Sequence, residues 1–315
     1  MIRSGSALRT ARAYSPAGIS SFFEIVDRGR DGTPISNIMR VGARGGGFVI
    51  SKGVETIVKL TKRRKDKITV YINGQLCKEA KTTAAAARTV LRRAGIHAKV
   101  SIHHSTRIPI GCGFGTSAAG ALSTVFALCQ ALDLELTYNQ MGQIAHAAEV
   151  RCKTGLGTVG PLMVGGQVLT LQAGAPGFNV IDRIPVDSTC RIVAGWFGPI
   201  SKPTVLTDKR RALMINQYGS MATRAILKNP TAENFFLECR KFADSIGFMT
   251  ERLRSLISAM QSSGAIGATQ NMLGEAAHAL VKREKERRVH QEMRRYLPPD
   301  RILSTDIDFQ GARLT

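Results

Sequence analysis

A run of alternating glycines most constrains how this chain can fold. The segment from Arg107 to Ala121 reads RIPIGCGFGTSAAGA, with Gly111, Gly113 and Gly115 directly before a long apolar stretch of helical period. Glycine lets the backbone approach an anion closely, and the first turn of a helix has unpaired N–H groups at the positive end of its dipole. The pattern therefore predicts a phosphate-binding loop between a strand and a helix.

Other structures are compatible with parts of this loop. A tight strand-to-helix turn that binds no ligand would use the same glycines. A dinucleotide fingerprint is disfavoured because Thr116 occupies the position of its third glycine, and the chain has no G-x-x-x-x-G-K-[ST] P-loop. Gly115, Ser117 and Ala119 approach the spacing of a nucleophile elbow, but no alternating glycines precede an elbow.

The length and composition indicate a globular protein with two domains. The chain has 315 residues with 43% hydrophobic content, and its longest apolar runs are shorter than a membrane span. Its six cysteines are scattered without a C-x-x-C pair, and the N-terminus lacks the apolar core of a secretory signal. We therefore expect free thiols, no membrane association and a cytoplasmic location.

The positive charge of the chain leaves two classes of partner open. A net charge of +21 suits a nucleic-acid-binding protein or an enzyme that attracts polyanionic substrates. Two basic clusters occur, one at 59–67 in an expected hairpin connection and one at 281–295 in an expected helix. Aromatic residues make up 6% of the chain and do not interleave with these clusters. We therefore do not expect nucleic acid as a partner.

Strand and helix patterns alternate up to about residue 200, and helical patterns dominate from Asp208 onward. This shift predicts a domain boundary near residue 200. We expect a first strand at 7–14 to end at a turn marked by Pro16 and Gly18. Thr137 is expected to cap a helix at 138–152, and a third glycine-rich loop at 263–271 is expected to open a helix at 272–285.

In this order, the segments resemble the GHMP kinase superfamily, and within it the archaeal pantoate kinases. The superfamily pattern P-x-x-x-G-x-G-S-S-A-A is matched by Pro109 to Ala119. Nearly the whole chain takes part in the resemblance, through the segments SPAGISSFF, GARGGGF, IGCGFGTSAAGAL, AHAAEVRCKTGLG, GAIGATQNMLGEA and IDFQGARL.

The resemblance implies an α+β fold with two domains, 1–200 and 201–315, and an active site between them. It implies transfer of a phosphoryl group from ATP, with Mg²⁺, to the hydroxyl of pantoate. The product would be 4-phosphopantoate, an intermediate of the archaeal route to coenzyme A. Homodimers are common among such proteins, so we expect one here.

The resemblance also implies the site residues. The ATP phosphates would be bound by the loop and the start of the helix that follows it, at Pro109, Gly111, Gly113, Phe114, Gly115, Thr116, Ser117 and Ala118. Ser117 and Glu149 would hold the magnesium ion, because hydroxyl and carboxylate oxygens are the ligands that it prefers. His146, Arg44 and Ser20 are the candidate contacts to pantoate.

Three positions depart from the pattern of the pantoate kinases. Thr158 stands where relatives carry an aspartate that accepts or orients the proton of the substrate hydroxyl, and Ala43 and Thr170 replace a serine and an arginine. Threonine is no general base at neutral pH. Phosphoryl transfer depends mainly on positioning and charge stabilisation, so we expect Ser117, Glu149 and Thr158 to form the catalytic set without a protein base.

The departures leave alternatives to pantoate open. A kinase of this superfamily could act on another small hydroxy acid or alcohol, similar to mevalonate, homoserine or shikimate. A non-catalytic protein on this fold could use its positive charge to bind RNA or another polyanion. ADP release with a panel of acceptors distinguishes these possibilities.

Overall fold

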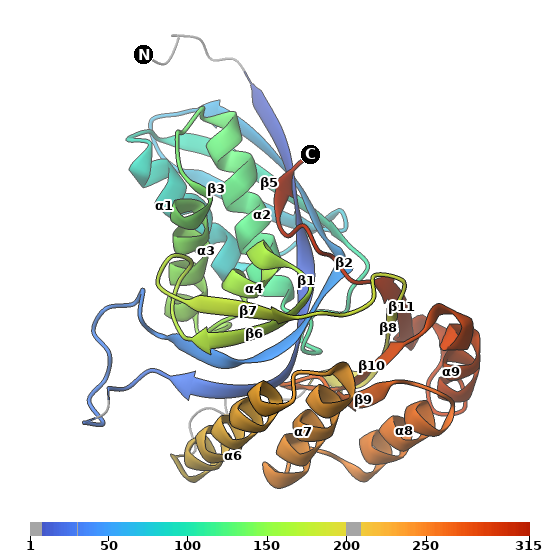
Figure 1. The fold of residues 1–315 in the computed structure, drawn as a ribbon. Helices are drawn as coiled ribbons and strands as arrows, with labels where there is room; N and C mark the ends of the chain where they lie inside the picture. The colour runs from blue at the N-terminus through green and yellow to red at the C-terminus, as the bar shows by residue number, and fades with distance from the viewer. Residues whose placement is uncertain (1–7, 30, 200–208) are drawn as a thin grey trace.

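Two β-sheets with helices packed on them make up the protein (Figure 1). The structure is a computed structural model, and it describes residues 8–29, 31–199 and 209–315. The predicted domain boundary at residue 200 and the predicted helix start at Asp208 lie outside the described residues. No helix in the described part of the chain is both long and apolar enough to cross a bilayer.

The larger sheet has eight strands and is built on two long antiparallel strands. In spatial order its strands are β12 (Arg313–Leu314), β1 (Arg9–Val26), β2 (Gly42–Lys62), β5 (Ala98–Thr106), β3 (Lys67–Ile72) and β4 (Gln75–Leu76), with β6 (Gln167–Gln172) on β2 and β7 (Val180–Ile184) on β6. Residues 54–62 of β2 pair with β5, whereas residues 45–48 pair with β6. The two long strands therefore run through both parts of this sheet.

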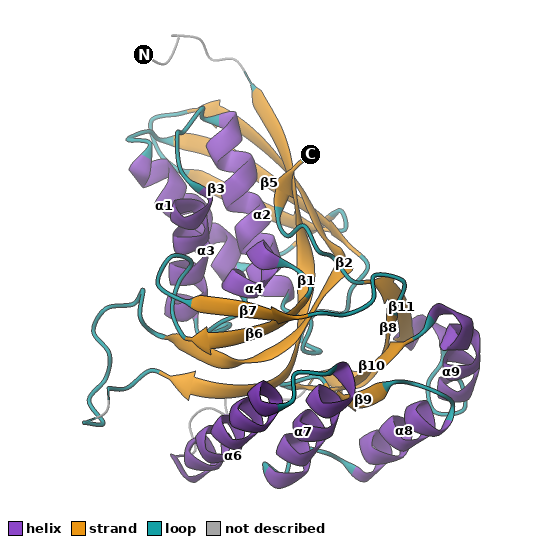
Figure 2. Ribbon diagram, viewed as in Figure 1, coloured by secondary structure: helices purple, strands orange, loops and turns teal. Residues whose placement is uncertain are grey.

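Four helices cover one face of the larger sheet (Figure 2): α1 (Lys81–Arg93), α2 (Thr116–Ala131), α3 (Tyr138–Cys152) and α4 (Val159–Val164). Helix α2 is the central one, because it contacts α1, α3, β1 and β2. Its small residues Ala118, Ala119 and Ala121 are fully buried, so the helix lies close to the sheet. This packing gives the start of α2 a rigid support.

The smaller sheet has the strand order β11 (Ile302–Asp306), β8 (Arg191–Pro199), β10 (Gly274–Val281) and β9 (Gly267–Gln270). The helices of the C-terminal half are α6 (Lys209–Lys228), which packs on β1 and α7, α7 (Ala232–Ser245), α8 (Glu251–Ser262) and α9 (Glu286–Met293), with the short 3₁₀ turns η1 (Arg283–Lys285) and η2 (Pro299–Arg301). Helices α7 and α8 pack on β9, and α8 also packs on β10.

Aromatic side chains join the two sheets. Phe22 of β1 and Phe48 of β2 are fully buried against Phe235 and Phe236 of α7. Ring centroids are 6.0 Å apart for Phe22 and Phe235, and 5.4 Å apart for Phe48 and Phe236. Each such pair contributes about 1 kcal/mol beyond its buried area. The parts of β1 and β2 that contain Phe22 and Phe48 therefore belong to a core that they share with the C-terminal helices.

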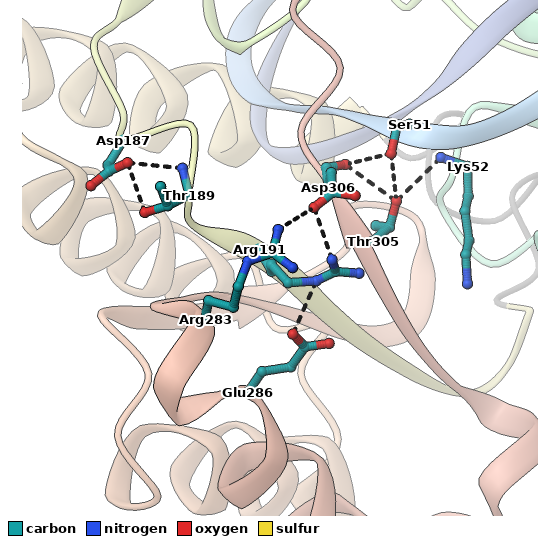
Figure 3. Close-up of polar contacts among 9 residues, drawn as sticks. All are labelled: Ser51, Lys52, Asp187, Thr189, Arg191, Arg283, Glu286, Thr305 and Asp306. Carbon is teal, nitrogen blue, oxygen red and sulfur yellow. Dashed lines mark hydrogen bonds and ion pairs between the residues drawn. The ribbon is translucent and has the colours of Figure 1, made fainter.

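A polar network adds to this junction on the side of β11 (Figure 3). Arg191 of β8 pairs with Glu286 at 3.1 Å and with Asp306 at 2.9 Å. The hydroxyl of Thr305 accepts a hydrogen bond of 3.2 Å from the Lys52 N–H of β2. Burial and the nearby Arg107 and Arg191 lower the pKa of Lys52. Part of the positive charge of the chain, such as that of Arg191, thus forms ion pairs that stabilise the fold.

The predicted turn at Pro16 and Gly18 is wrong, because β1 continues through both residues. The ladder with β2 instead contains a bulge between Ser15 and Ala17. Proline has no N–H for a ladder and is tolerated at a bulge. The N–H of Gly18 donates to the carbonyl of Phe114 at 3.2 Å, which ties the strand to the glycine loop.

The predicted helix at 272–285 is also wrong, since most of this segment forms strand β10. Its alanine-rich sequence suits a helix, but β10 is buried and hydrogen-bonded to β8 on one side and β9 on the other. Leu273 adopts a φ of 53°, which turns the chain from β9 into β10. The basic segment 59–67 is likewise no hairpin, because β3 pairs in parallel with β5 and not with β2.

Elements with strong local signals agree with the sequence. Thr137 caps α3 in a full capping box with Gln140, and α3 spans the predicted residues. Asn73 and Gly74 both have positive φ and connect β3 to β4. The C-terminal residues form two separate strands, because β11 pairs with β8 and β12 with β1.

Candidate active site

A cavity of about 680 Å³ lies between the glycine loop and the long strands. Its walls come from both halves of the chain: β1, β2, the loop 111–117, the α3–α4 connection at 153–158, and the β9–β10 turn at Met272 and Leu273. The predicted residues Ser20, Arg44 and Thr158 line it together with Gly111 to Ser117 apart from Cys112. Sequence positions more than 150 residues apart thus meet around one space.

The glycine loop has a backbone that only glycine adopts readily. Gly111, Gly113 and Gly115 have φ values of 83°, 81° and 62°. A Cβ atom on Gly113 would lie 3.0 Å from the Cβ of Asn271, and one on Gly115 would lie 2.7 Å from Cγ2 of Thr158. Both the left-handed conformation and the close neighbours therefore require glycine here.

The first turn of α2 has no acidic residue of its own. Gly115 is the N-cap of this helix, without a side-chain hydrogen bond. The first backbone N–H groups of a helix lack intrahelical partners and carry the positive end of the dipole. An anion such as phosphate fits this position.

Ser117 and Glu149 form the polar centre of the site. The Ser117 hydroxyl donates to Oε1 of Glu149 at 2.7 Å, and the hydroxyl of Thr154 donates to the same oxygen at 3.1 Å. Glu149 is 2% exposed. A Cβ atom on Gly155 would lie 2.5 Å from Oε2 of Glu149, so the connection after α3 lies directly against the carboxylate.

These two side chains fit a magnesium ion. A hydroxyl and a carboxylate supply the hard oxygen ligands that Mg²⁺ prefers, and they stand beside the proposed phosphate position. Among the described residues, no group of three or more His, Cys, Asp and Glu side chains could hold a metal by itself. A magnesium ion here would therefore complete its coordination with phosphate oxygens and water.

Charged side chains are few in the cavity wall. Within the described residues they are Asp27, Arg44 and Lys153. The Arg44 guanidinium forms an ion pair with Glu24, which is 3% exposed and also accepts a 3.2 Å hydrogen bond from Thr223. Arg44 is thus held in place by a buried carboxylate while it faces the cavity.

Thr158 lies between the glycine loop and strand β1. Besides its approach to Gly115, its Cγ2 would lie 3.5 Å from a Cβ atom on Gly18. Ala43 lies 3.1 Å, through its Cβ, from the position of a Cβ atom on Gly157. Ala43, Thr158 and Thr170 all line the cavity, so the three departures from the family pattern share one region.

The structure does not bring His146 to the cavity. It is 1% exposed, and its Nε2 lies 3.0 Å from the carbonyl of Val41 and 3.3 Å from that of Ile38. Burial lowers the pKa of His146, so the neutral ring donates from Nε2 to these carbonyls. The residue holds the chain that leads into β2 instead of facing the substrate position.

Three further predicted residues also lie outside the cavity wall: Glu149, Pro109 and Ala118. Glu149 reaches the site through Ser117, as described above. Sequence reasoning missed Asp27, Lys153, Met272 and Leu273. The K-T-G-L-G turn pointed to Lys153, but residues 272–273 gave no signal because the segment was expected to be helical.

Comparisons with known proteins agree on one family. The family described as "GHMP kinases N terminal domain" matches residues 81–166. A pantoate kinase of Methanocaldococcus jannaschii is 30% identical over 275 residues, which cover 86% of this chain and 93% of that protein. A pantoate kinase of Thermococcus kodakarensis is 29% identical over 284 residues, which cover 89% and 90%.

A solved structure supports the same relationship. It is described as a phosphotransferase related to the CoA biosynthesis pathway, and it superposes with a TM-score of 0.85 at 27% identity. The match covers 97% of this chain and 98% of that chain. The predicted α+β fold of this superfamily is therefore confirmed.

Proposed function

The chain belongs to the GHMP kinase family, and from that premise we propose that it transfers the γ-phosphoryl group of ATP to pantoate. It is a small-molecule kinase with an alcohol group as acceptor, and the product is 4-phosphopantoate, a coenzyme A precursor. The observation that carries the proposal is the Ser117–Glu149 pair at the end of the glycine loop, in which Ser117 lines the cavity and Glu149 lies directly behind it.

The nucleotide occupies the loop side of the cavity. Gly111, Gly113 and Gly115 leave room for the phosphates, and the N–H groups at the start of α2 bind their oxygens. Ser117 and Glu149 would hold Mg²⁺, and a metal ion there would supply positive charge to neutralise the phosphate oxygens during transfer.

The acceptor occupies the side formed by β1 and β2. Arg44 binds the carboxylate of pantoate, because it is the cation that Glu24 fixes in the cavity wall, and Ser20 lies on the neighbouring strand. The hydroxyl oxygen forms a bond to the γ-phosphorus while the bond to the ADP oxygen breaks. The hydroxyl proton leaves with solvent, because no described carboxylate lies beside Thr158 in the cavity wall.

Asp27 does not substitute for the missing base. It lies on the far part of the cavity wall, nine residues after Gly18 along the same extended chain. Nine residues of strand span about 30 Å. Since Gly18 is the β1 residue next to Thr158, Asp27 is too far from the transfer position.

A different acceptor is the second candidate function. Ala43 and Thr170 replace polar and charged residues of the pantoate kinases in the cavity wall, and this change favours a substrate with another pattern of polar groups. Mevalonate, homoserine and shikimate are the acceptors to compare with pantoate. The third candidate function is binding of RNA or another polyanion by a basic protein that has no catalytic turnover.

Purified protein with Mg-ATP and each acceptor in turn tests the proposal, with ADP release as the measurement. Pantoate is expected to give the highest kcat/KM. Turnover only with another acceptor would replace pantoate by that acceptor. No turnover with any acceptor, combined with salt-sensitive RNA binding that ATP does not displace, would favour the binding protein.

The assembly and location belong to the same proposal. We expect a cytoplasmic homodimer, with residues 1–200 and 201–315 as its two domains. Light scattering of the eluted protein measures the mass of the particle, and limited proteolysis near residue 200 tests the boundary.

A further inference from the structure

A buried histidine connects the two sheets behind the glycine loop. His278 of β10 is fully buried, and its Nε2 lies 2.8 Å from the Ser21 hydroxyl of β1. Its Nδ1 lies 2.8 Å from Oδ1 of Asn271, at the β9–β10 turn. Ser21 and Asn271 are also fully buried. One side chain thus links the strand that carries Ser20 to the turn that closes the cavity.

The ring must be neutral and has one defined tautomer. Burial lowers the pKa of His278 to about 3. A neutral imidazole has one donor and one acceptor nitrogen. The amide oxygen of Asn271 requires the donor at Nδ1, so Nε2 accepts the hydrogen bond from Ser21. The chain of contacts therefore has a single direction and holds Asn271 in one orientation.

Asn271 stands directly behind the phosphate loop. Its Cβ is the atom that a Cβ on Gly113 would approach to 3.0 Å, and the carbonyl of Met272 is equally close. A Cβ on Gly274 would lie 2.3 Å from the carbonyl oxygen of Cys112. The turn 271–274 therefore packs directly against the glycine loop. The contact leaves no space for the loop or the turn to move toward the other.

The turn is tied to β1 at the same level. The N–H of Met272 donates to the carbonyl of Ser20 at 2.7 Å, and both residues line the cavity. The Nδ2 atom of Asn271 is buried and has no hydrogen-bond partner among the described residues. An amide group left unpaired in this way costs free energy, and a functional role of its position would explain why it is retained.

We propose that the buried Ser21–His278–Asn271 relay positions the glycine loop for the nucleotide, with His278 as the positioning residue. The relay sets how tightly the loop binds the phosphates and does not contact the acceptor. This inference rests on the proposed nucleotide site. It assigns a role in that site to a residue that does not line the cavity.

Two substitutions separate the ends of the relay. His278→Asn retains a donor at the position of Nδ1 and thus the bond to Asn271, whereas His278→Gln retains only the contact to Ser21. We expect His278→Gln to raise the Kd for Mg-ADP and the KM for ATP about tenfold, as for the loss of one buried hydrogen bond. The KM for the acceptor stays within about twofold, and His278→Asn restores most of the nucleotide affinity.

A matched control comes from a second buried histidine. His104 bonds to Thr56 at 2.7 Å and to Thr83 at 3.1 Å, and it does not line the cavity. His104→Gln is expected to lower the midpoint of thermal unfolding without changing the Kd for Mg-ADP. An equal loss of ADP affinity in His104→Gln would overturn the inference, because general destabilisation would then explain both.

A further variant covers the case in which His278→Gln does not fold. Asn271→Ala removes the last contact of the relay and is expected to weaken Mg-ADP binding to a similar extent. Unchanged Mg-ADP affinity in either folded variant would overturn the inference. Wild-type protein that binds Mg-ADP but phosphorylates no acceptor would count against the proposed function only, since the relay is tested by ADP binding alone.

Discussion

The Ser117 hydroxyl lies 2.7 Å from the Glu149 carboxylate and joins the first turn of α2 to the last turn of α3. Neither side chain could be placed opposite the other by local sequence, since they are 32 residues apart. The packing of α2 against α3 creates the pair, and the glycine loop places it beside the proposed phosphate position.

Removing either partner should reduce catalysis strongly. Ser117→Ala and Glu149→Gln each remove an oxygen ligand or its charge, and we expect kcat to fall roughly 100-fold or more. Circular dichroism is expected to show an intact fold. Thr89→Ala is the control, because the Thr89 hydroxyl bonds to the carbonyl of Ala85 within the same helix, α1. Wild-type kcat in Glu149→Gln would remove the carboxylate from the proposed site.

Gly155 should be essential because of space alone. In Gly155→Ala the new Cβ would meet Oε2 of Glu149 at 2.5 Å, so the carboxylate must move. Misplacement of a metal ligand should lower kcat about tenfold or more and raise the Mg²⁺ concentration needed for half-maximal rate. Gly198→Ala is the matched control, since among the described residues other than its two chain neighbours no atom lies within 4 Å of its added Cβ. Equal rates in both variants would contradict the placement of Glu149.

Thr158 tests whether a base is missing. In Thr158→Asp a carboxylate returns beside the loop, and kcat is expected to stay equal or to rise by up to about 100-fold. Thr158→Val keeps the shape without the hydroxyl and serves as the comparison. A large loss of rate in Thr158→Asp, with Thr158→Val unaffected, would show that negative charge is not tolerated there and that the acceptor hydroxyl lies elsewhere.

Arg44 should act on the acceptor and not on the nucleotide. Arg44→Met is expected to raise the KM for the acceptor about 10-fold to 100-fold while the KM for ATP stays constant. The variant leaves Glu24 buried without its cation, which costs about 3 kcal/mol or more, so the double variant with Glu24→Gln should recover stability but not affinity. Arg88→Met on the exposed face of α1 controls for net charge. A parallel rise in the KM for ATP would contradict the assignment.

Stability should fall on mild acidification. Burial lowers the pKa of His104 to about 4 and that of His278 to about 3, whereas both histidines titrate near 6.5 when unfolded. Below about pH 6.5 the unfolded chain therefore binds more protons than the folded one, and each histidine removes up to about 1.4 kcal/mol per pH unit. Urea unfolding between pH 7.5 and 5 measures this slope.

The contribution of His278 to this pH dependence of the free energy of unfolding can be measured separately. In His278→Gln the pH dependence should weaken by the share of one histidine. Working above pH 5 keeps the carboxylates with lowered pKa, such as Glu275, ionised in both states. A free energy of unfolding that does not change between pH 7.5 and 5 would contradict the buried neutral state of both histidines.

Local chemistry explains which elements could be predicted. The capping box at Thr137 and the loop at Gly111 to Gly115 each depend on residues close in sequence. The segment 272–285 failed because its alanines suit a helix by propensity. The segment forms a strand because it is hydrogen-bonded to β8, which is distant in sequence, and to β9, which lies across a turn.

His146 shows the same limit within the site. Helical spacing correctly places it one turn before Glu149 on α3. Spacing does not tell which neighbour covers each side chain, and the segment that precedes β2 covers His146 and takes its hydrogen bond. Tertiary structure has the opposite effect on Arg44. The buried Glu24 of the adjacent strand directs this side chain to the cavity.

The sequence by itself determined the conformation of the glycine loop, because positive φ demands glycine whatever surrounds it. It also determined the family, through motifs whose order extends over nearly the whole chain. Only the tertiary structure decided what stands opposite the loop. Thr158, Arg44 and the Asn271 turn reach it through β-sheet pairing and helix packing between distant segments, and such contacts have no local signal.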